Sequence, residues 1–164
     1  MREIIFRGQT RRYGEKVNMA GNKLSSRWVY GGIFPQNNDG DFAIIYQQEP
    51  EIEKFTVYAD TVGQYTGVKD KNGQKIFEGD IIRVEFATTV TDVYDFEEPR
   101  VWYVNYEVYF DDCSHEWRVR YWDDIETLWE YDEDCEVVGN ILDNPELINP
   151  YVEWETIQNE LRDI

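Results

Sequence analysis

Residues 61–84 read TVGQYTGVKDKNGQKIFEGDIIRV, and this stretch decides the fold class. Asn72 and Gly73 lie between two runs of β-favouring residues, which is a strong signal for a hairpin. A second break follows at residues 78–80, before a new apolar run begins at Ile81. The stretch therefore predicts three strands joined by two tight corners. Short strands with tight corners are typical of a small antiparallel barrel or sandwich, and they indicate no catalytic centre.

Strand patterns extend along the chain on both sides of this stretch. The predicted strands are residues 4–6, 27–34, 42–47, 54–59, 81–90, 101–110, 115–122 and 136–141. Residues 101–110 alternate most clearly, since Trp102 and Tyr106 share one face while Asn105 falls on the other. Residues 91–100 are acidic and contain a proline, which predicts an exposed loop. Residues 123–131 predict one or two helical turns, because Asp and Glu suit the start of a helix.

The end of the chain has a helical pattern instead. Residues 150–162 follow an Asn-Pro pair, and Trp154, Ile157 and Leu161 recur along one stripe. We therefore expect an amphipathic helix that packs on the sheet or on a neighbouring subunit. The predicted fold is mostly β, of the α+β class, with a C-terminal amphipathic helix.

Three blocks of this sequence resemble the YopX family. They are REIIFRG at 2–8 followed by WVYGG at 28–32, GQYTGVKDKNGQKIFEGDII at 63–82, and EVVGNILDNPELI at 136–148. The resemblance implies an accessory protein of phages and prophages of Gram-positive bacteria, with no established activity and no catalytic residues to transfer. Residues 85–135 and the tail after 150 carry no family signal. The predicted layout is a YopX-like β-rich domain over 1–149, containing a basic loop or arm at 8–26, and a helix over 150–164.

The net charge of −18 is divided unevenly along the chain. Residues 1–82 hold 11 Lys or Arg and 11 Asp or Glu, whereas residues 83–164 hold 5 and 23. Residues 1–38 carry seven basic and two acidic groups, a net of +5. Because phosphate binding requires a basic surface, nucleic acid is an unfavourable partner for the chain as a whole.

The candidate binding residues lie in and beside the basic arm. They are Arg7, Arg11, Arg12, Tyr13, Lys16 and Arg27. Basic groups beside aromatic rings can bind single-stranded nucleic acid by charge and stacking. The alternative is that the arm lies against the acidic half of its own chain or of a neighbouring copy, and the charge layout favours this alternative.

The segment Cys113-Ser114-His115 contains the one histidine of the chain. Alternate positions on a strand project to the same face, so a thiolate–imidazole pair is geometrically possible. A nucleophile also needs an orienting group and an oxyanion site, and no neighbouring motif supplies either. We therefore predict a cysteine beside a turn, a surface histidine and no catalytic residues.

Other candidate chemistry also has a structural explanation. Two cysteines with one histidine lack the paired spacing of a zinc site, and the acidic run from 123 to 136 lacks the central glycine of a calcium loop. Gly63, Gly67, Gly73 and Gly79 match no dinucleotide or phosphate-loop spacing, so we expect them at corners or bulges. We predict no metal, no cofactor and a solvated acidic face.

No apolar run is long enough for a transmembrane helix, and residues 1–12 lack the pattern of a signal peptide. We expect a protein of the bacterial host cytoplasm, with Cys113 and Cys135 as free thiols. Three functions are considered. The first is a non-enzymatic module that binds proteins and forms a homo-oligomer, with a host protein as a further partner. The second is an acidic nucleic-acid mimic that inhibits a host DNA-binding enzyme, and the third is a β-barrel that binds single-stranded nucleic acid.

Overall fold

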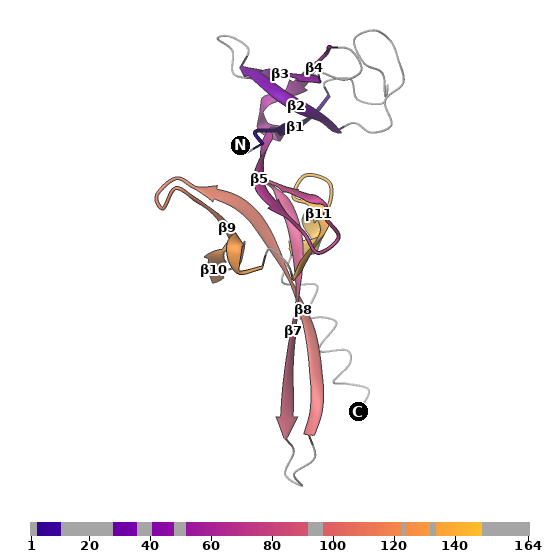
Figure 1. The fold of residues 1–164 in the computed structure, drawn as a ribbon, viewed down its shortest axis with the longest axis vertical. Helices are drawn as coiled ribbons and strands as arrows, with labels where there is room; N and C mark the ends of the chain where they lie inside the picture. Colours follow the sequence, from indigo (N-terminus) through magenta and orange to yellow (C-terminus); the bar gives the residue numbers. More distant parts are fainter. Residues whose placement is uncertain are drawn as a thin grey trace. The chain divides into compact units, whose positions relative to one another are not determined.

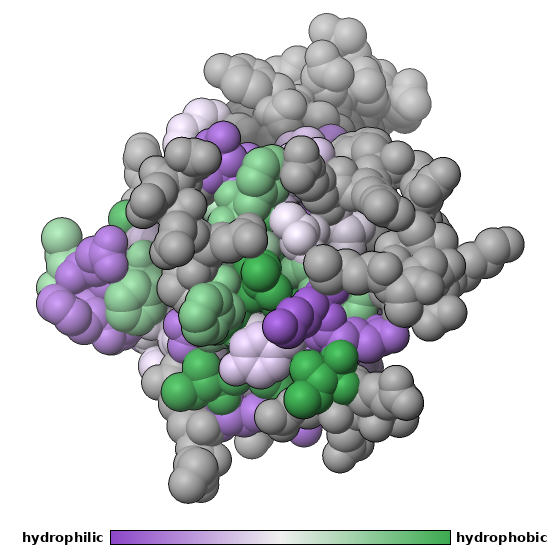
Figure 2. Space-filling view, turned by 90° about the horizontal axis from the view of Figure 1, so that it is seen from above, coloured by the Kyte–Doolittle hydropathy of each residue, from purple (hydrophilic) through white to green (hydrophobic). Residues whose placement is uncertain are grey.

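The computed structural model describes residues 3–10, 28–35, 41–47, 52–91, 97–122, 124–131 and 134–148. The chain divides into two compact units, residues 1–67 and residues 68–164 (Figure 1). Each unit has its own cluster of buried apolar side chains. Apolar and charged residues are interspersed on the face of the molecule that Figure 2 shows.

The first unit is an antiparallel sheet. Its strands are β1 (Phe6–Gln9), β2 (Trp28–Pro35), β3 (Phe42–Gln47), β4 (Glu53–Tyr58) and the first part of β5 (Gly63–Lys69). The spatial order is β4-β3-β2-β1-β5. Ile45 on β3, with Phe55 and Val57 on β4, forms the centre of the apolar cluster, as alternation along each strand requires.

Strand β2 passes close to β3 at Gly31. A Cβ atom built on Gly31 would overlap the carbonyl oxygen of Tyr46. Glycine therefore allows the two backbones to approach here, and the strand continues through Gly31 and Gly32.

The second unit contains the end of β5 and a five-stranded antiparallel sheet. Its further strands are β6 (Lys75–Phe77), β7 (Asp80–Thr91), β8 (Glu97–Asp111), β9 (Glu116–Tyr121), β10 (Asp124–Thr127) and β11 (Cys135–Asn140). The five-stranded sheet has the order β10-β9-β8-β7-β11. Its core face carries Ile82, Val84, Tyr106, Val108 and Val119.

The β5–β6 hairpin is closed by the side chain of Asp70. Its Oδ1 accepts hydrogen bonds from the backbone N–H groups of Asn72 and Gln74, at 2.9 and 2.8 Å. Its Oδ2 accepts one from the N–H of Val137 on β11, at 3.0 Å. The backbone N–H of Asp70 donates to the carbonyl oxygen of Gln74 at 2.9 Å, so the loop between them has three residues. Its last residue, Gly73, has a φ of 79°. Asp70 thus shapes the turn and also joins it to β11.

The second corner of the opening stretch lies between β6 and β7. The carboxylate of Asp80 is buried and accepts a hydrogen bond from the N–H of Phe77 at 2.7 Å. Gly79 has a φ of 77°, and its N–H donates to the carbonyl oxygen of Val108 at 2.8 Å. With Gly67 at 92°, three of the four glycines predicted at corners or bulges have positive φ.

The structure confirms a mostly β fold with two antiparallel sheets. Each sheet has two different edge strands, so the described residues form no closed barrel, and the barrel prediction is wrong. The physical reason is that the apolar residues divide into two clusters instead of lining one interior. The described helical segments are short 3-10 turns, η1 (Ala59–Thr61), η2 (Leu128–Glu130) and η3 (Pro145–Ile148). The predicted helix over 150–164 lies outside the described residues.

Two local predictions also need correction. Residues 97–100 were expected in a loop, but they pair with β7 as the beginning of β8. Residues 124–127 were expected to be helical, but they form β10, which pairs with β9, and only the following η2 makes a helical turn. Among the described residues, no helix has the length and apolarity needed to cross a bilayer.

We predict that Asp70→Ala destabilises the second unit by about 2 kcal/mol, because three backbone N–H groups lose their acceptor. Asp70→Asn should reduce the free energy of unfolding by less, since its carboxamide keeps one oxygen that can accept a hydrogen bond. Urea unfolding followed by tryptophan fluorescence would measure the loss. The control is Asp112→Ala, which removes an exposed carboxylate in another turn of the same unit and should change the free energy of unfolding by less than about 0.5 kcal/mol. Equal losses for the two alanine variants would contradict the role of Asp70.

Candidate functional site: the aromatic face of the second unit

Aromatic side chains form a connected series on the core face of β7 and β8. Phe86 and Trp102 are direct partners in the β7–β8 register, as are Ile82 and Tyr106. The rings of Phe86 and Trp102 are stacked, with centroids 5.6 Å apart. Because paired residues of an antiparallel sheet project to the same side, the alternation of the two strands brings these rings together.

Tyr131, which follows η2, links the two ends of this series. Its ring stacks on that of Tyr106 at 5.5 Å and meets Phe86 edge-on at 6.3 Å. Tyr106 in turn contacts Tyr121 edge-on at 6.3 Å. We call this series the aromatic ladder, and its members are Trp102, Phe86, Tyr131, Tyr106 and Tyr121.

The ladder runs from the interior of the unit to its surface. Tyr106 is 4% exposed, whereas Trp102 is 45% exposed. Val101 and Tyr103, which flank Trp102 on β8, are 51% and 52% exposed. Trp102 therefore presents apolar surface to solvent from a ring that packed side chains already hold in place.

Glu126 on β10 is bound to the ladder. The hydroxyl of Tyr131 donates a hydrogen bond to Oε2 of Glu126 at 2.6 Å. Burial raises the pKa of Tyr131 far above its usual value, and the hydrogen bond to Glu126 raises it further. Burial also raises the pKa of Tyr106. Both phenols are therefore held neutral, and the ladder stabilises the sheet through stacking without a charged ring.

The opposite face of the sheet carries polar contacts. Arg83 on β7 donates from Nε to Oδ1 of Asn105 at 3.0 Å, and Nδ2 of Asn105 donates to the carbonyl oxygen of Leu147 at 2.8 Å. Asn105 is buried, and this chain of contacts joins η3 to the centre of β8. Arg120 binds both carboxylate oxygens of Glu107, at 2.9 and 2.8 Å, and lies over the ring of Tyr109.

The Cys113-Ser114-His115 segment lies in the turn between β8 and β9, not on a strand. The carboxylate of Asp111 accepts hydrogen bonds from the N–H of Cys113 at 2.9 Å and from the hydroxyl of Ser114 at 2.8 Å. These two bonds lower the pKa of Asp111. The alternation that would have placed Cys113 and His115 on one face therefore does not apply, and His115 has a φ of 59°.

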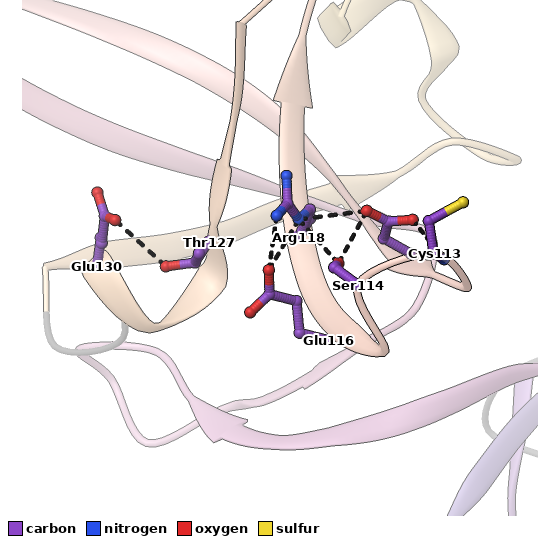
Figure 3. Close-up of polar contacts among 7 residues, drawn as sticks. Cys113, Ser114, Glu116, Arg118, Thr127 and Glu130 are labelled. Carbon is purple, nitrogen blue, oxygen red and sulfur yellow. Dashed lines mark hydrogen bonds and ion pairs between the residues drawn. The ribbon is translucent and has the colours of Figure 1, made fainter.

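Figure 3 shows how this turn is closed. Arg118 lies between Glu116 and Ser114, with bonds of 2.7 and 3.2 Å, and the thiol of Cys113 points away from these contacts. A separate bond of 3.3 Å joins Thr127 to Glu130. The geometry is that of a hairpin turn held by its own polar side chains. Both cysteines are free thiols, Cys113 exposed and Cys135 buried.

The structure describes one of the six predicted binding residues. Arg7 lies on β1, is 7% exposed and has its guanidinium 4.8 Å from the ring centre of Trp28. The others, Arg11, Arg12, Tyr13, Lys16 and Arg27, lie outside the described residues. Over the part of the chain that the structure describes, no three His, Cys, Asp or Glu side chains gather as metal ligands would.

Sequence reasoning missed the contacts that complete the ladder. The alternation of residues 101–110 placed Trp102 and Tyr106 on one face, but it gave no position for Tyr131 or Glu126. The one available signal was the buried Leu128 between them, an apolar residue within an acidic run that fixes η2 against the core.

We predict that the stability of the second unit falls as pH rises above about 10, the usual pKa of tyrosine. A folded-state pKa raised above the unfolded value contributes stability that is present below the unfolded pKa and is lost as pH rises toward the folded value. Ultraviolet absorbance of the phenolate, recorded together with urea unfolding, would measure this. In Tyr131→Phe the free energy of unfolding should decrease less steeply as pH rises above about 10. Tyr30→Phe, which changes an exposed ring of the first unit, should leave the steepness of that decrease unchanged. A fall of the same steepness in Tyr131→Phe would contradict the prediction.

Comparison with known proteins gives a family but no activity. No curated protein is significantly similar to the chain. A crystal structure of protein EF1440 from Enterococcus faecalis is similar, with a TM-score of 0.48, 21% sequence identity, and coverage of 91% of this chain and 100% of that chain. The family described as YopX protein matches residues 22–149, which is more than half of the sequence. The chain therefore belongs to the YopX family.

Proposed function

We propose that this protein is a phage-encoded accessory protein that binds other proteins in the host cytoplasm and catalyses no reaction itself. The observation that carries the proposal is the exposed end of the aromatic ladder. Trp102 is 45% exposed although its ring is stacked on Phe86. Tryptophan and tyrosine are the residues most enriched at the energetic centres of protein interfaces.

The surroundings of Trp102 support this use. The indole of Trp102 stacks on Phe86, and Phe86 is in turn packed against Tyr131. The indole is therefore already held in place and loses little conformational entropy when a partner covers it. A preorganised aromatic anchor of this kind suits protein recognition better than it suits general acid–base chemistry.

The proposal that the protein is not an enzyme is supported by the turn that contains Cys113. The polar groups around it, Asp111, Ser114 and Arg118, bind one another and close the β8–β9 hairpin. The thiol points away from these groups (Figure 3). Their contacts are explained by the turn itself.

We predict that Trp102→Ala abolishes the retention of the protein's partners from a lysate of the bacterial host. Truncation removes the anchor and about 1 kcal/mol of stacking, so the fold should persist. Quantitative mass spectrometry of proteins retained on the immobilised chain would measure the effect. Trp129→Ala is the matched control, because Trp129 is 53% exposed on η2 and is not part of the ladder. Equal retention by the two variants, or no protein retained by the unaltered chain, would oppose the proposal.

A second candidate function is imitation of nucleic acid by the acidic second unit. The observation in its favour is that three arginines of the unit are already engaged. Arg118 binds Glu116 and Asp111, Arg120 binds Glu107, and Arg83 binds Asn105. The exposed carboxylates of Glu85, Asp112, Asp124 and Asp134 are therefore not neutralised by these cations. Carboxylates on a sheet can occupy a groove that normally binds phosphates.

For this second function we predict competition with DNA for a host DNA-binding enzyme. The chain should displace a DNA duplex from basic enzymes of the host, and its potency should fall as salt rises. Asp124→Asn with Asp134→Asn should weaken the competition, while the control pair Asp41→Asn with Asp60→Asn, exposed in the first unit, should not. Competition that is insensitive to both pairs and to salt would argue against mimicry.

A further inference from the structure

Strands β7 and β8 extend beyond the rest of their sheet as a two-stranded arm (Figure 1). β11 pairs with β7 only as far as Val84, and β9 pairs with β8 only from Glu107 onward. The β7–β8 pairing itself continues to Thr91 and Glu97. The arm therefore comprises residues 85–91 and their partners 97–103, and among the described strands none pairs with either of its outer edges.

The two edges of the arm differ in composition. Residues 86–91 of β7 read FATTVT, which contains no charge and no proline and includes four β-branched residues. Residues 97–100 of β8 read EEPR, which contains three charges and a proline. Proteins protect exposed edge strands with charges and proline, so residues 97–100 of β8 are a protected edge and residues 86–91 of β7 are not.

We propose that the β7 edge pairs antiparallel with the β7 edge of a second copy of the chain. This deepens the proposed interaction function by naming the partner of one surface, and it rests on that function. The pairing converts two isolated ribbons into one four-stranded sheet, β8-β7-β7-β8, which is a more stable unit than a two-stranded hairpin.

The composition of the edge favours a second copy as its occupant. Each chain carries a net charge of −18, so two copies meet most easily along a segment without charge, and residues 86–91 are such a segment. A two-fold axis at Thr88 or Thr89 places that threonine opposite its own copy, and cross-strand threonine pairs are favourable. The outer edges of the resulting sheet are the two β8 strands, and the charges and proline of their residues 97–100 disfavour the addition of further copies there.

Antiparallel pairing about a two-fold axis requires that one residue of β7 lies opposite itself. A single cysteine at that position can form a disulfide between copies. In a Cys113→Ser background, which removes the exposed thiol, cysteine is placed in turn at Phe86, Ala87, Thr88, Thr89, Val90 and Thr91. We expect one strong disulfide-linked dimer within this series and none for Val101→Cys on β8. No dimer at any of the six positions would overturn the proposal.

The second part of the experiment places a protecting lysine on the β7 edge. Thr89→Lys and Ala87→Lys should each weaken the dimer at least about tenfold, measured by sedimentation equilibrium. Asn72→Lys is the control, because it makes the same change of charge at an exposed turn and should leave the dimer intact. Each of the three lysine variants makes the net charge of the chain less negative, which by itself favours association. A loss of dimer that occurs only in the two edge variants therefore indicates pairing through the β7 edge.

The outcomes separate this inference from the proposed function. If the chain stays monomeric at its highest soluble concentration, the edge pairing is overturned. The binding of partners through Trp102 is not affected by that result, because the Trp102→Ala experiment tests it separately. A dimer that persists in both lysine variants also overturns the edge pairing, while self-association itself stands.

Discussion

The carboxylate of Asp70 is the contact on which the arrangement of the second unit depends. Packing of apolar side chains holds strands together, but it tolerates small slips, and a slip of one residue reverses every side chain. Asp70 binds two N–H groups of its own turn and the N–H of Val137, which is 67 residues away in the sequence. Lys71 adds a backbone hydrogen bond to the carbonyl oxygen of Cys135 at 3.0 Å. The hairpin and the edge strand β11 are thereby fixed relative to one another, and the core side chains between them follow.

Periodicity predicted the strands that depend on local pattern. Phe42–Gln47 has the bounds expected from its sequence, and the two corners of residues 61–84 lie where the glycines suggested. Residues 97–100 were missed because their charges and proline are typical of a loop. Proline is tolerated in an edge strand, and the long register of β7 extends the pairing through Pro99. Residues 124–127 were missed because their acids suit a helix start, whereas pairing with β9 overrides that preference.

The candidate site was only half predictable for a related reason. Alternation gives the face of each ring on a strand, so Trp102 and Tyr106 were placed together from the sequence. Tyr131 belongs to no strand, and its contacts with Tyr106 and Glu126 depend on how η2 turns the chain back over the sheet. No spacing rule relates a residue in an irregular segment to a ring more than twenty positions earlier.

Stability and recognition share side chains in the aromatic ladder. The buried rings stabilise the sheet, and the same stacking holds Trp102 in a position where a partner can cover it. The charged groups of the opposite face have a different role, since they pair across strands and keep that face soluble. One face of the sheet thus makes the apolar contacts, and the opposite face carries the charged groups that interact with water.

The close approach of β2 and β3 has an evolutionary consequence. Since any side chain at position 31 would collide with main-chain atoms of Tyr46, descent can alter the neighbouring positions of β2 but not this one. Position 73 is constrained by conformation alone, because nothing lies within 4 Å of a Cβ built there, so an asparagine is an accessible replacement. Divergent relatives should therefore retain glycine at the first position and vary at the second.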